Sequence, residues 1–208
     1  FLRNYNPWGI ILFERNCNSR KQLKELIDNI KISTHADIPI MIDQEGGRVH
    51  RLKYSDNFIL YPAKQFGEIY KIDEKEAKEA LNLQCKIIAS ELNDLGITIN
   101  TSPVLDIPEG NESGVIGDRS FSKDKEIVSN LGKEVIESFI SMGINPVIKH
   151  MPGHGRAEVD SHFNLPVVDT SYNTLIETDF YPFEFCNFSN LAMTAHVVYS
   201  NIDSELPA

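Results

Sequence analysis

Residues 123–150 read KDKEIVSNLGKEVIESFISMGINPVIKH, and this stretch decides the fold class. Its first part is typical of a helix, and Gly143 ends that helix because glycine readily takes the left-handed conformation of a helix C-terminus. Residues 146–150, PVIKH, then form a short apolar strand with a polar end. A continuous apolar strand indicates burial on both faces, so the stretch predicts one helix–strand unit of an α/β protein.

The same alternation of helices and apolar strands is expected along the whole chain. Further strands are expected at residues 9–13, 39–42, 97–100 and 191–198, and further helical segments at residues 19–30, 73–95 and 170–185. Five strands joined by helical crossovers predict a parallel sheet with both faces covered.

Five such units fit either a doubly wound open sheet or the first part of a (β/α)8 barrel. Polar residues stand at the C-terminal ends of different strands: Asp43, Asp106, Lys149, His150 and His196. A barrel builds its active site from many strands at this rim, whereas a doubly wound sheet more often has a glycine-rich first turn. Residues 14–18 contain no glycine. The sequence therefore favours an α/β fold of the TIM (β/α)8 type, truncated after about five βα units.

Length and termini suggest an incomplete domain. The chain has 208 residues, 41% hydrophobic and 24% charged, which is typical of one globular domain. It starts at Phe1 without an initiator Met, and residues 204–208 form a loop after a strand. We expect residues 1–208 to be a single barrel domain that is incomplete at both ends.

Charge and cysteine content exclude several classes of partner. The formal net charge is -10, so nucleic acid and anionic membranes are not expected as partners, and a small ligand is. No apolar run is long enough for a membrane span. Cys17, Cys85 and Cys186 are odd in number and in no CxxC pattern, which indicates reduced thiols in a cytoplasmic protein. The sequence carries no signal for an oligomeric state.

The densest polar segment is KHMPGHGRAEVDSH, residues 149–162. Two chemistries compete for it. A divalent metal can be held by imidazole and carboxylate groups, here those of His150, His154, Asp160 and His162. Alternatively, Asp160 orients the His162 imidazole for proton transfer. The spacing matches no metal template, so the dyad is favoured and no metal or cofactor is expected.

A second polar cluster is DQEGGRVHR, residues 43–51. Asp43 can accept hydrogen bonds from ligand hydroxyls, and Arg48 or Arg51 can donate to them. The alternative is an internal salt bridge that anchors the loop. In a third segment, residues 117–121, Asp118 can pair with Arg119 or cap the following helix.

Four motifs occur together: IDQEGGRV at residues 42–49, GDRSF at 117–121, KHMPGHG at 149–155 with DSH at 160–162, and MTAHV at 193–197. In this order, and over residues 9 to about 199, they resemble the β-N-acetylglucosaminidases of glycoside hydrolase family three.

The resemblance implies a barrel that removes terminal N-acetylglucosamine from peptidoglycan-derived muropeptides in the cytoplasm, as part of cell-wall recycling. It implies that sugar hydroxyls are held by Asp43, Arg51, Arg119, Lys149 and His150. Apart from the resemblance, Arg48, His154 and His196 are further candidates for the site. His162, assisted by Asp160, matches the family's general acid/base of a retaining mechanism.

The family's nucleophile is an aspartate in a Ser-Asp-Asp type motif on a later strand. No such motif occurs in these 208 residues, so the nucleophile is expected outside this chain, and the chain alone is expected to be inactive. Two alternatives stay open. A neutral imidazole as acid/base would not repel phosphate, which allows a phosphorylase, and a missing nucleophile suits a non-catalytic sugar-binding barrel. The Asp160–His162 dyad favours the enzyme.

Overall fold

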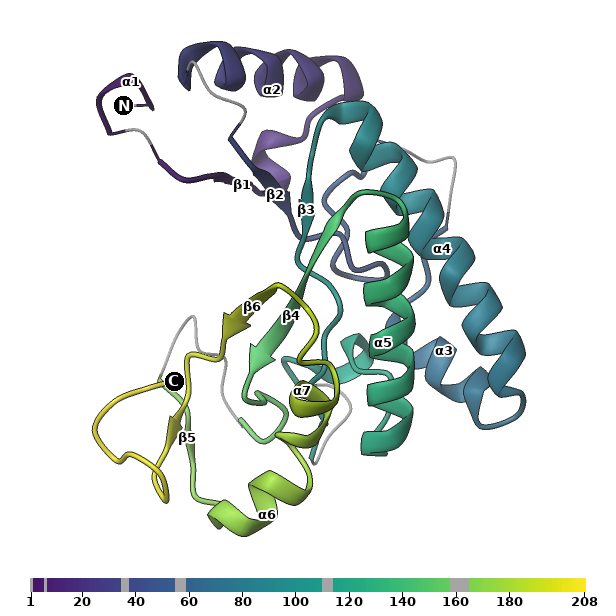
Figure 1. Cartoon of the computed structure of the whole chain (residues 1–208), viewed down its shortest axis with the longest axis vertical. Coiled ribbons are helices and arrows are strands. Elements are labelled where there is room, and N and C mark those ends of the chain that lie inside the picture. The colour runs from purple at the N-terminus through teal and green to yellow at the C-terminus, as the bar shows by residue number, and fades with distance from the viewer. Residues whose placement is uncertain (1, 6, 35–37, 55–58, 110–113, 158–164) are drawn as a thin grey trace.

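The computed structural model describes residues 2–5, 7–34, 38–54, 59–109, 114–157 and 165–208 (Figure 1). The helices are α1 (Leu2–Tyr5), α2 (Arg20–Thr34), α3 (Ala63–Tyr70), α4 (Glu74–Leu95), α5 (Lys125–Ser141), α6 (Tyr172–Glu177) and α7 (Tyr181–Phe185), with 3-10 turns η1 (Glu14–Asn16) and η2 (Gly117–Arg119). The strands are β1 (Ile10–Leu12), β2 (Ile40–Ile42), β3 (Ile99–Asn100), β4 (Asn145–Met151), β5 (Val167–Val168), β6 (Leu191–Thr194) and β7 (Val198–Tyr199).

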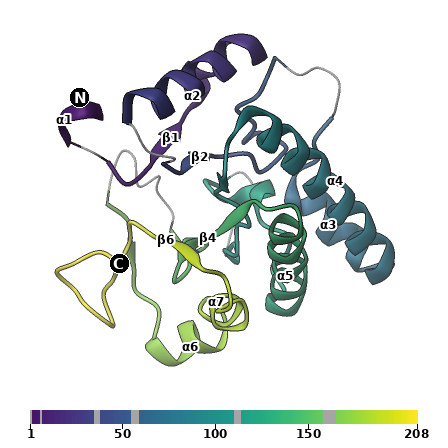
Figure 2. The same ribbon diagram turned by 45° about the horizontal axis from the view of Figure 1, so that its top comes forward.

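Five of these strands form one parallel sheet in the order β1-β2-β3-β4-β6. Both Figures 1 and 2 show α2, α4 and α5 on the same side of this sheet. The helix–strand alternation and the parallel sheet predicted from the sequence are therefore confirmed, although these three helices cover one face of the sheet and not both. Because all five strands run in one direction, their C-terminal ends lie along one edge.

The long helices begin and end where local chemistry requires. The side chain of Asp73 accepts from the Glu76 backbone N–H at 2.9 Å and caps the start of α4. Gly96 ends α4 at φ 86°, a left-handed conformation that costs other residues more. Asp124 caps α5 in the same way through the Glu126 N–H, at 2.9 Å.

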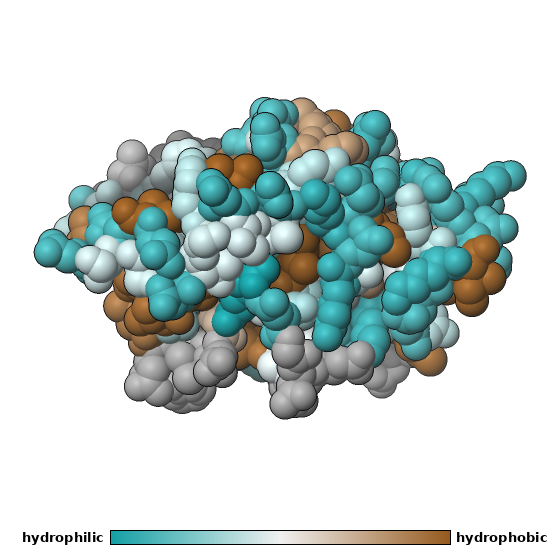
Figure 3. Space-filling model, turned by 90° about the horizontal axis from the view of Figure 1, so that it is seen from below, coloured by the Kyte–Doolittle hydropathy of each residue, from teal (hydrophilic) through white to brown (hydrophobic). Residues whose placement is uncertain are grey.

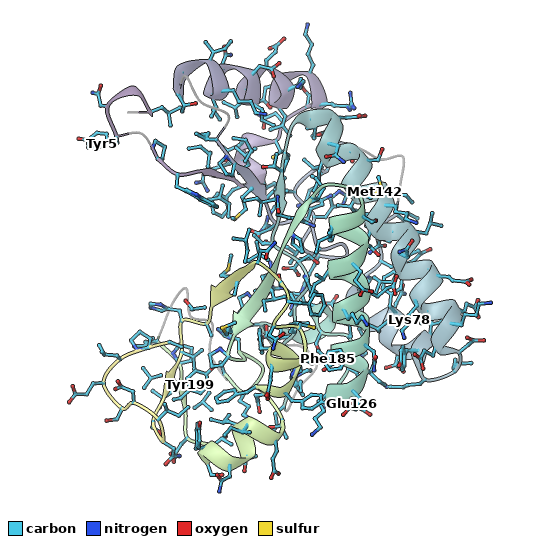
Figure 4. All side chains as sticks on the ribbon, viewed as in Figure 1. Tyr5, Lys78, Glu126, Met142, Phe185 and Tyr199 are labelled. Atoms are coloured by element: carbon cyan, nitrogen blue, oxygen red, sulfur yellow. The ribbon has the colours of Figure 1, made fainter. Side chains whose placement is uncertain are left out.

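The main core lies between the sheet and these helices. Buried apolar side chains include Ile40 and Ile42 of β2, Leu92 of α4, and Leu131 and Phe139 of α5. Helix α7, whose last residue Phe185 is labelled in Figure 4, packs against α5. A continuous apolar layer between the sheet and the helices therefore supports the strands whose ends carry the polar residues.

Several features differ from the sequence-based expectation, among them the short elements α1 and β5, which were not expected. The strand expected at residues 191–198 is divided into β6 and β7, because the chain leaves the main sheet after Thr194. Strand β7 pairs in parallel with β5 in a second, two-stranded sheet. Helix α3 was not expected from the sequence.

In the part of the chain that the structure describes, no helix combines the length and apolar character needed to cross a membrane. Cys17, Cys85 and Cys186 are free and buried, so they form no disulfide with one another. The face seen from below in Figure 3 is mostly hydrophilic, with hydrophobic residues in small separate areas.

Candidate active site

The predicted polar residues meet at the C-terminal edge of the main sheet. A cavity of about 370 Å³ there is lined by Asp43, Arg51, Arg119, Lys149, His150 and His196, among other residues. Asp43 follows β2, Lys149 and His150 belong to β4, and His196 follows β6. The structure thus brings together the residues that the sequence proposed for one binding site.

Lys149 is the buried centre of this site, with only 1% of its surface exposed. Its Nζ lies 3.2 Å from Asp43 Oδ1, 2.5 Å from Glu45 Oε1 and 3.0 Å from Thr101 Oγ1. A buried ammonium is costly unless it is paired and hydrogen-bonded, and here two carboxylates and a hydroxyl satisfy it.

Asp43 is held ionised by its neighbours. Burial raises the pKa of Asp43, but the Lys149 charge, the Thr101 hydroxyl and the Arg51 guanidinium outweigh it and bring the pKa to about 2. Arg51 Nη2 lies 3.2 Å from Asp43 Oδ2, and the Thr101 hydroxyl donates to Asp43 Oδ1. Asp43 is therefore an anionic hydrogen-bond acceptor on the cavity wall.

Glu45 and Arg119 form a bidentate ion pair across the site. Arg119 Nε donates to Glu45 Oε2 at 2.9 Å and Nη2 to Oε1 at 2.7 Å. Burial raises the pKa of Glu45, but Lys149 and Arg119 outweigh it and lower the pKa below its ordinary value. These two parallel hydrogen bonds fix the planar Arg119 guanidinium, and its Nη1 takes no part in the ion pair.

Arg48 does not join the residues at the cavity wall. It lies outside the lining of this cavity, and its Nε pairs with Asp118 Oδ1 at 2.8 Å. Its Nη2 also donates to the carbonyls of Val115 and Ile116, at 2.7 and 2.9 Å. This geometry favours the loop-anchoring alternative for Arg48, and Asp118 pairs with Arg48 rather than with Arg119.

Behind the cavity wall, Asp106 holds two histidines. Asp106 Oδ2 lies 2.6 Å from His150 Nδ1, and Oδ1 accepts from the backbone N–H of His154 at 2.7 Å. His154 is 4% exposed, and burial lowers the pKa of its imidazole. Among the described residues its Nδ1 has no hydrogen-bond partner.

The turn after β4 lies against the segment after β3. A Cβ on Gly155 would lie 1.8 Å from the Ile107 carbonyl oxygen, so only glycine allows this approach. Next to it, Arg156 Nε donates to Asp179 Oδ2 at 2.7 Å, and Arg156 also pairs with Glu109. The close contact at Gly155 and the ion pairs of Arg156 hold the turn after β4 in place up to Ala157.

Asp160 and His162, the residues matched to the acid/base dyad, lie outside the described residues. Of the residues that the structure describes, no group of three or more His, Cys, Asp or Glu side chains is placed to hold a metal ion.

Three polar residues of the site were missed by sequence reasoning. Glu45 lies within the quoted DQEGGR motif, and Asp106 had been placed at a strand end, so both had a usable signal. Thr101 had none, because a single threonine after a strand is common in loops.

The sequence is similar to known proteins over its whole length. The family model described as "Glycosyl hydrolase family 3 N terminal domain" matches residues 1–208. A curated "Beta-hexosaminidase" of Hydrogenovibrio crunogenus is 37% identical over 203 residues, covering 96% of this chain. The chain spans 56% of that relative's length.

Solved structures share the fold. NagZ from Neisseria gonorrhoeae in complex with N-trifluoroacetyl-D-glucosamine matches 96% of this chain and 59% of that chain, with a TM-score of 0.87 and 36% identity. The same protein in complex with zinc ion matches equally well, with a TM-score of 0.87, 35% identity and the same two coverages. A β-N-acetylglucosaminidase from Paenibacillus sp. matches 99% of this chain and 39% of that chain, with a TM-score of 0.89 and 32% identity. The TIM-barrel-like α/β fold expected from the sequence is confirmed.

Proposed function

Because the chain belongs to glycoside hydrolase family 3, we propose that its protein is a β-N-acetylglucosaminidase that releases terminal N-acetylglucosamine from a glycoside. The observation that carries this proposal is the paired array of Asp43, Lys149 and Arg51 at the cavity wall, beside His150. We propose that residues 1–208 contribute to one catalytic barrel domain.

The array suits a neutral sugar. Glu45 and Asp43 supply two negative charges, and Lys149, Arg51 and Arg119 supply three positive ones. Their pairing leaves hydrogen-bond acceptors and donors side by side on one wall. Neighbouring hydroxyls of a pyranose both donate and accept, so alternating donors and acceptors are complementary to them. We therefore assign sugar binding to Asp43, Arg51, Arg119, Lys149 and His150.

Proton transfer is assigned to residues that the structure does not describe. In this proposal His162 protonates the glycosidic oxygen of the leaving group and later removes a proton from the attacking water. Asp160 holds the imidazole in the required tautomer. The reaction retains configuration through a glycosyl-enzyme formed on an aspartate outside these 208 residues. Motif resemblance supports these roles.

The physiological substrate is inferred from the motif resemblance. We propose that it is a muropeptide derived from peptidoglycan, cleaved in the cytoplasm during cell-wall recycling. The support is the resemblance of the four motifs to enzymes with that role. No cofactor is needed, because the carboxylate and imidazole groups supply both the nucleophile and the proton donor.

The test is hydrolysis of an aryl N-acetyl-β-D-glucosaminide by the full-length protein. Asp43→Ala should lower kcat/KM by about 10- to 100-fold, because a charged acceptor for sugar hydroxyls is lost. Asp94→Ala is the matched control, since Asp94 is an exposed residue of α4 paired with Arg20. The assay is run with and without phosphate. A sugar phosphate as main product would indicate a phosphorylase, and binding without turnover would indicate a sugar-binding protein.

A further inference from the structure

We propose that Asp106 is a positioning residue that holds His150 with its Nδ1–H turned away from the cavity, so that Nε2 is the ring nitrogen offered to a ligand. This inference rests on the proposed function in one respect, namely that the ligand is a sugar. The geometry of Asp106 and His150 stands independently of it.

One carboxylate makes three contacts with the histidine turn. Asp106 is fully buried, and its Oδ2 lies 2.6 Å from His150 Nδ1. Its Oδ1 accepts from the backbone N–H groups of His150 and His154, at 3.2 and 2.7 Å. The side chain therefore fixes both the backbone and the ring of His150.

The charge of Asp106 determines which ring nitrogen carries the proton. Burial raises the pKa of Asp106, but its contacts with His150 and with the His154 N–H outweigh this and lower the pKa. An ionised carboxylate is only an acceptor, so the nitrogen 2.6 Å from it must be the donor. Nδ1 therefore carries a hydrogen, and in the neutral ring Nε2 keeps a lone pair.

The contact depends on how β3 and β4 are paired. Lys149 N–H donates to the Pro103 carbonyl at 3.1 Å, and Leu105 N–H donates to the Lys149 carbonyl at 2.8 Å. These bonds extend the pairing beyond β3 and place Asp106 beside His150. Gly153 N–H donates to the His150 carbonyl at 2.7 Å and closes the turn over the carboxylate.

A fixed tautomer has a consequence for recognition. His150 lines the cavity together with Asp43 and Lys149. With Nδ1 engaged by Asp106, a neutral His150 accepts a hydrogen bond at Nε2 from a ligand hydroxyl. Turning the tautomer around would convert this acceptor into a donor, so the same hydroxyl could no longer donate to Nε2 and would have to reverse its hydrogen bond.

The test uses Asp106→Asn in protein labelled with nitrogen-15 at histidine. The amide keeps an oxygen for the backbone N–H groups but turns its NH2 toward His150 Nδ1, which then must accept. Long-range proton–nitrogen spectra report which ring nitrogen is protonated, and His150→Gln identifies the His150 signals. We expect Nδ1 to be protonated in the wild type and Nε2 in Asp106→Asn.

Asp179→Asn is the matched control, because Asp179 is also a buried aspartate near this turn but pairs with Arg156. It should leave the His150 tautomer unchanged. The dissociation constant of N-acetylglucosamine should rise by about tenfold in Asp106→Asn, as expected when one hydrogen bond in a polar site is weakened by such a reversal.

The outcomes separate this inference from the proposed function. An unprotonated Nδ1 on His150 in the wild type overturns the positioning role. That measurement does not depend on whether any Asp106 variant folds. An unchanged tautomer in folded Asp106→Asn also overturns it. The expected tautomers without binding of N-acetylglucosamine by the wild type would support the positioning role and contradict the proposed function.

Discussion

Lys149 Nζ lies 3.2 Å from Asp43 Oδ1, although 106 residues separate them in the chain. The same ammonium lies 2.5 Å from Glu45 Oε1. The candidate site is therefore held by a buried charge cluster whose members come from different βα units.

Removing the cation from this cluster should strongly destabilise the fold. Lys149→Met leaves two buried carboxylates with fewer partners, and we expect a loss of about 3–5 kcal/mol in the free energy of unfolding. Urea denaturation measures it. Lys133→Met is the control, because the Lys133–Glu137 pair is exposed and its loss should cost under about 1 kcal/mol. Equal losses for both variants would contradict the stabilising role of the cluster.

Asp43 should make stability depend on pH in the acid range. Because the folded pKa, about 2, is below the ordinary value of 3.8, the stabilisation is complete above the unfolded pKa. It is lost as the pH falls from about 4 to about 2, and the difference corresponds to about 2 kcal/mol. Asp43→Asn should therefore flatten the dependence of the unfolding free energy on pH in this window. Asp94→Asn controls for removal of one negative charge, and a slope in Asp43→Asn equal to that of the wild type would refute the assignment.

The Arg156–Asp179 pair should couple more strongly than a surface pair. Asp179 is 1% exposed, so removing Arg156 leaves a buried carboxylate without its main cation. A double-mutant cycle with Arg156→Ala and Asp179→Ala should give a coupling energy above about 1.5 kcal/mol. The exposed Arg20–Asp94 pair should give under about 1 kcal/mol in the same assay. Coupling of similar size in the two pairs would show that the loop anchor contributes no more than a surface contact.

His162→Ala should affect substrates according to their leaving groups. A poor leaving group needs protonation, so its turnover should fall by at least about 100-fold, within the range that general acid catalysis contributes. An activated aryl glycoside departs with little protonation and should lose much less. Steady-state kinetics on both substrates decide this. Equal loss on both would mean that His162 positions the sugar or the fold and does not transfer the proton.

The purified protein should keep no tightly bound zinc after dialysis, because Asp160 and His162 are assigned to a dyad. Elemental analysis measures the metal content. A stoichiometric amount of zinc that survives dialysis and disappears in His162→Ala would replace the dyad with a metal site. The zinc complex of the Neisseria protein makes this a necessary measurement.

The sequence by itself determined the helix–strand alternation and the edge at which the site lies. Short apolar strands such as residues 146–150 require cover on both faces, and parallel strands direct their polar C-terminal residues to one edge. For that reason the sequence alone predicts that Asp43, Lys149 and His150 lie together.

Only the tertiary structure decided which of these groups contact one another. Asp106 meets His150 because residues 103–105 pair with Lys149 in one particular register, and a shift of one residue would turn Asp106 to the other face. The Glu45–Arg119 pair and the Arg48–Asp118 pair likewise depend on how the segment of residues 43–51 lies against that of residues 117–121. Sequence patterns report periodicity along one segment, whereas such contacts depend on the placement of two segments that are distant in the chain.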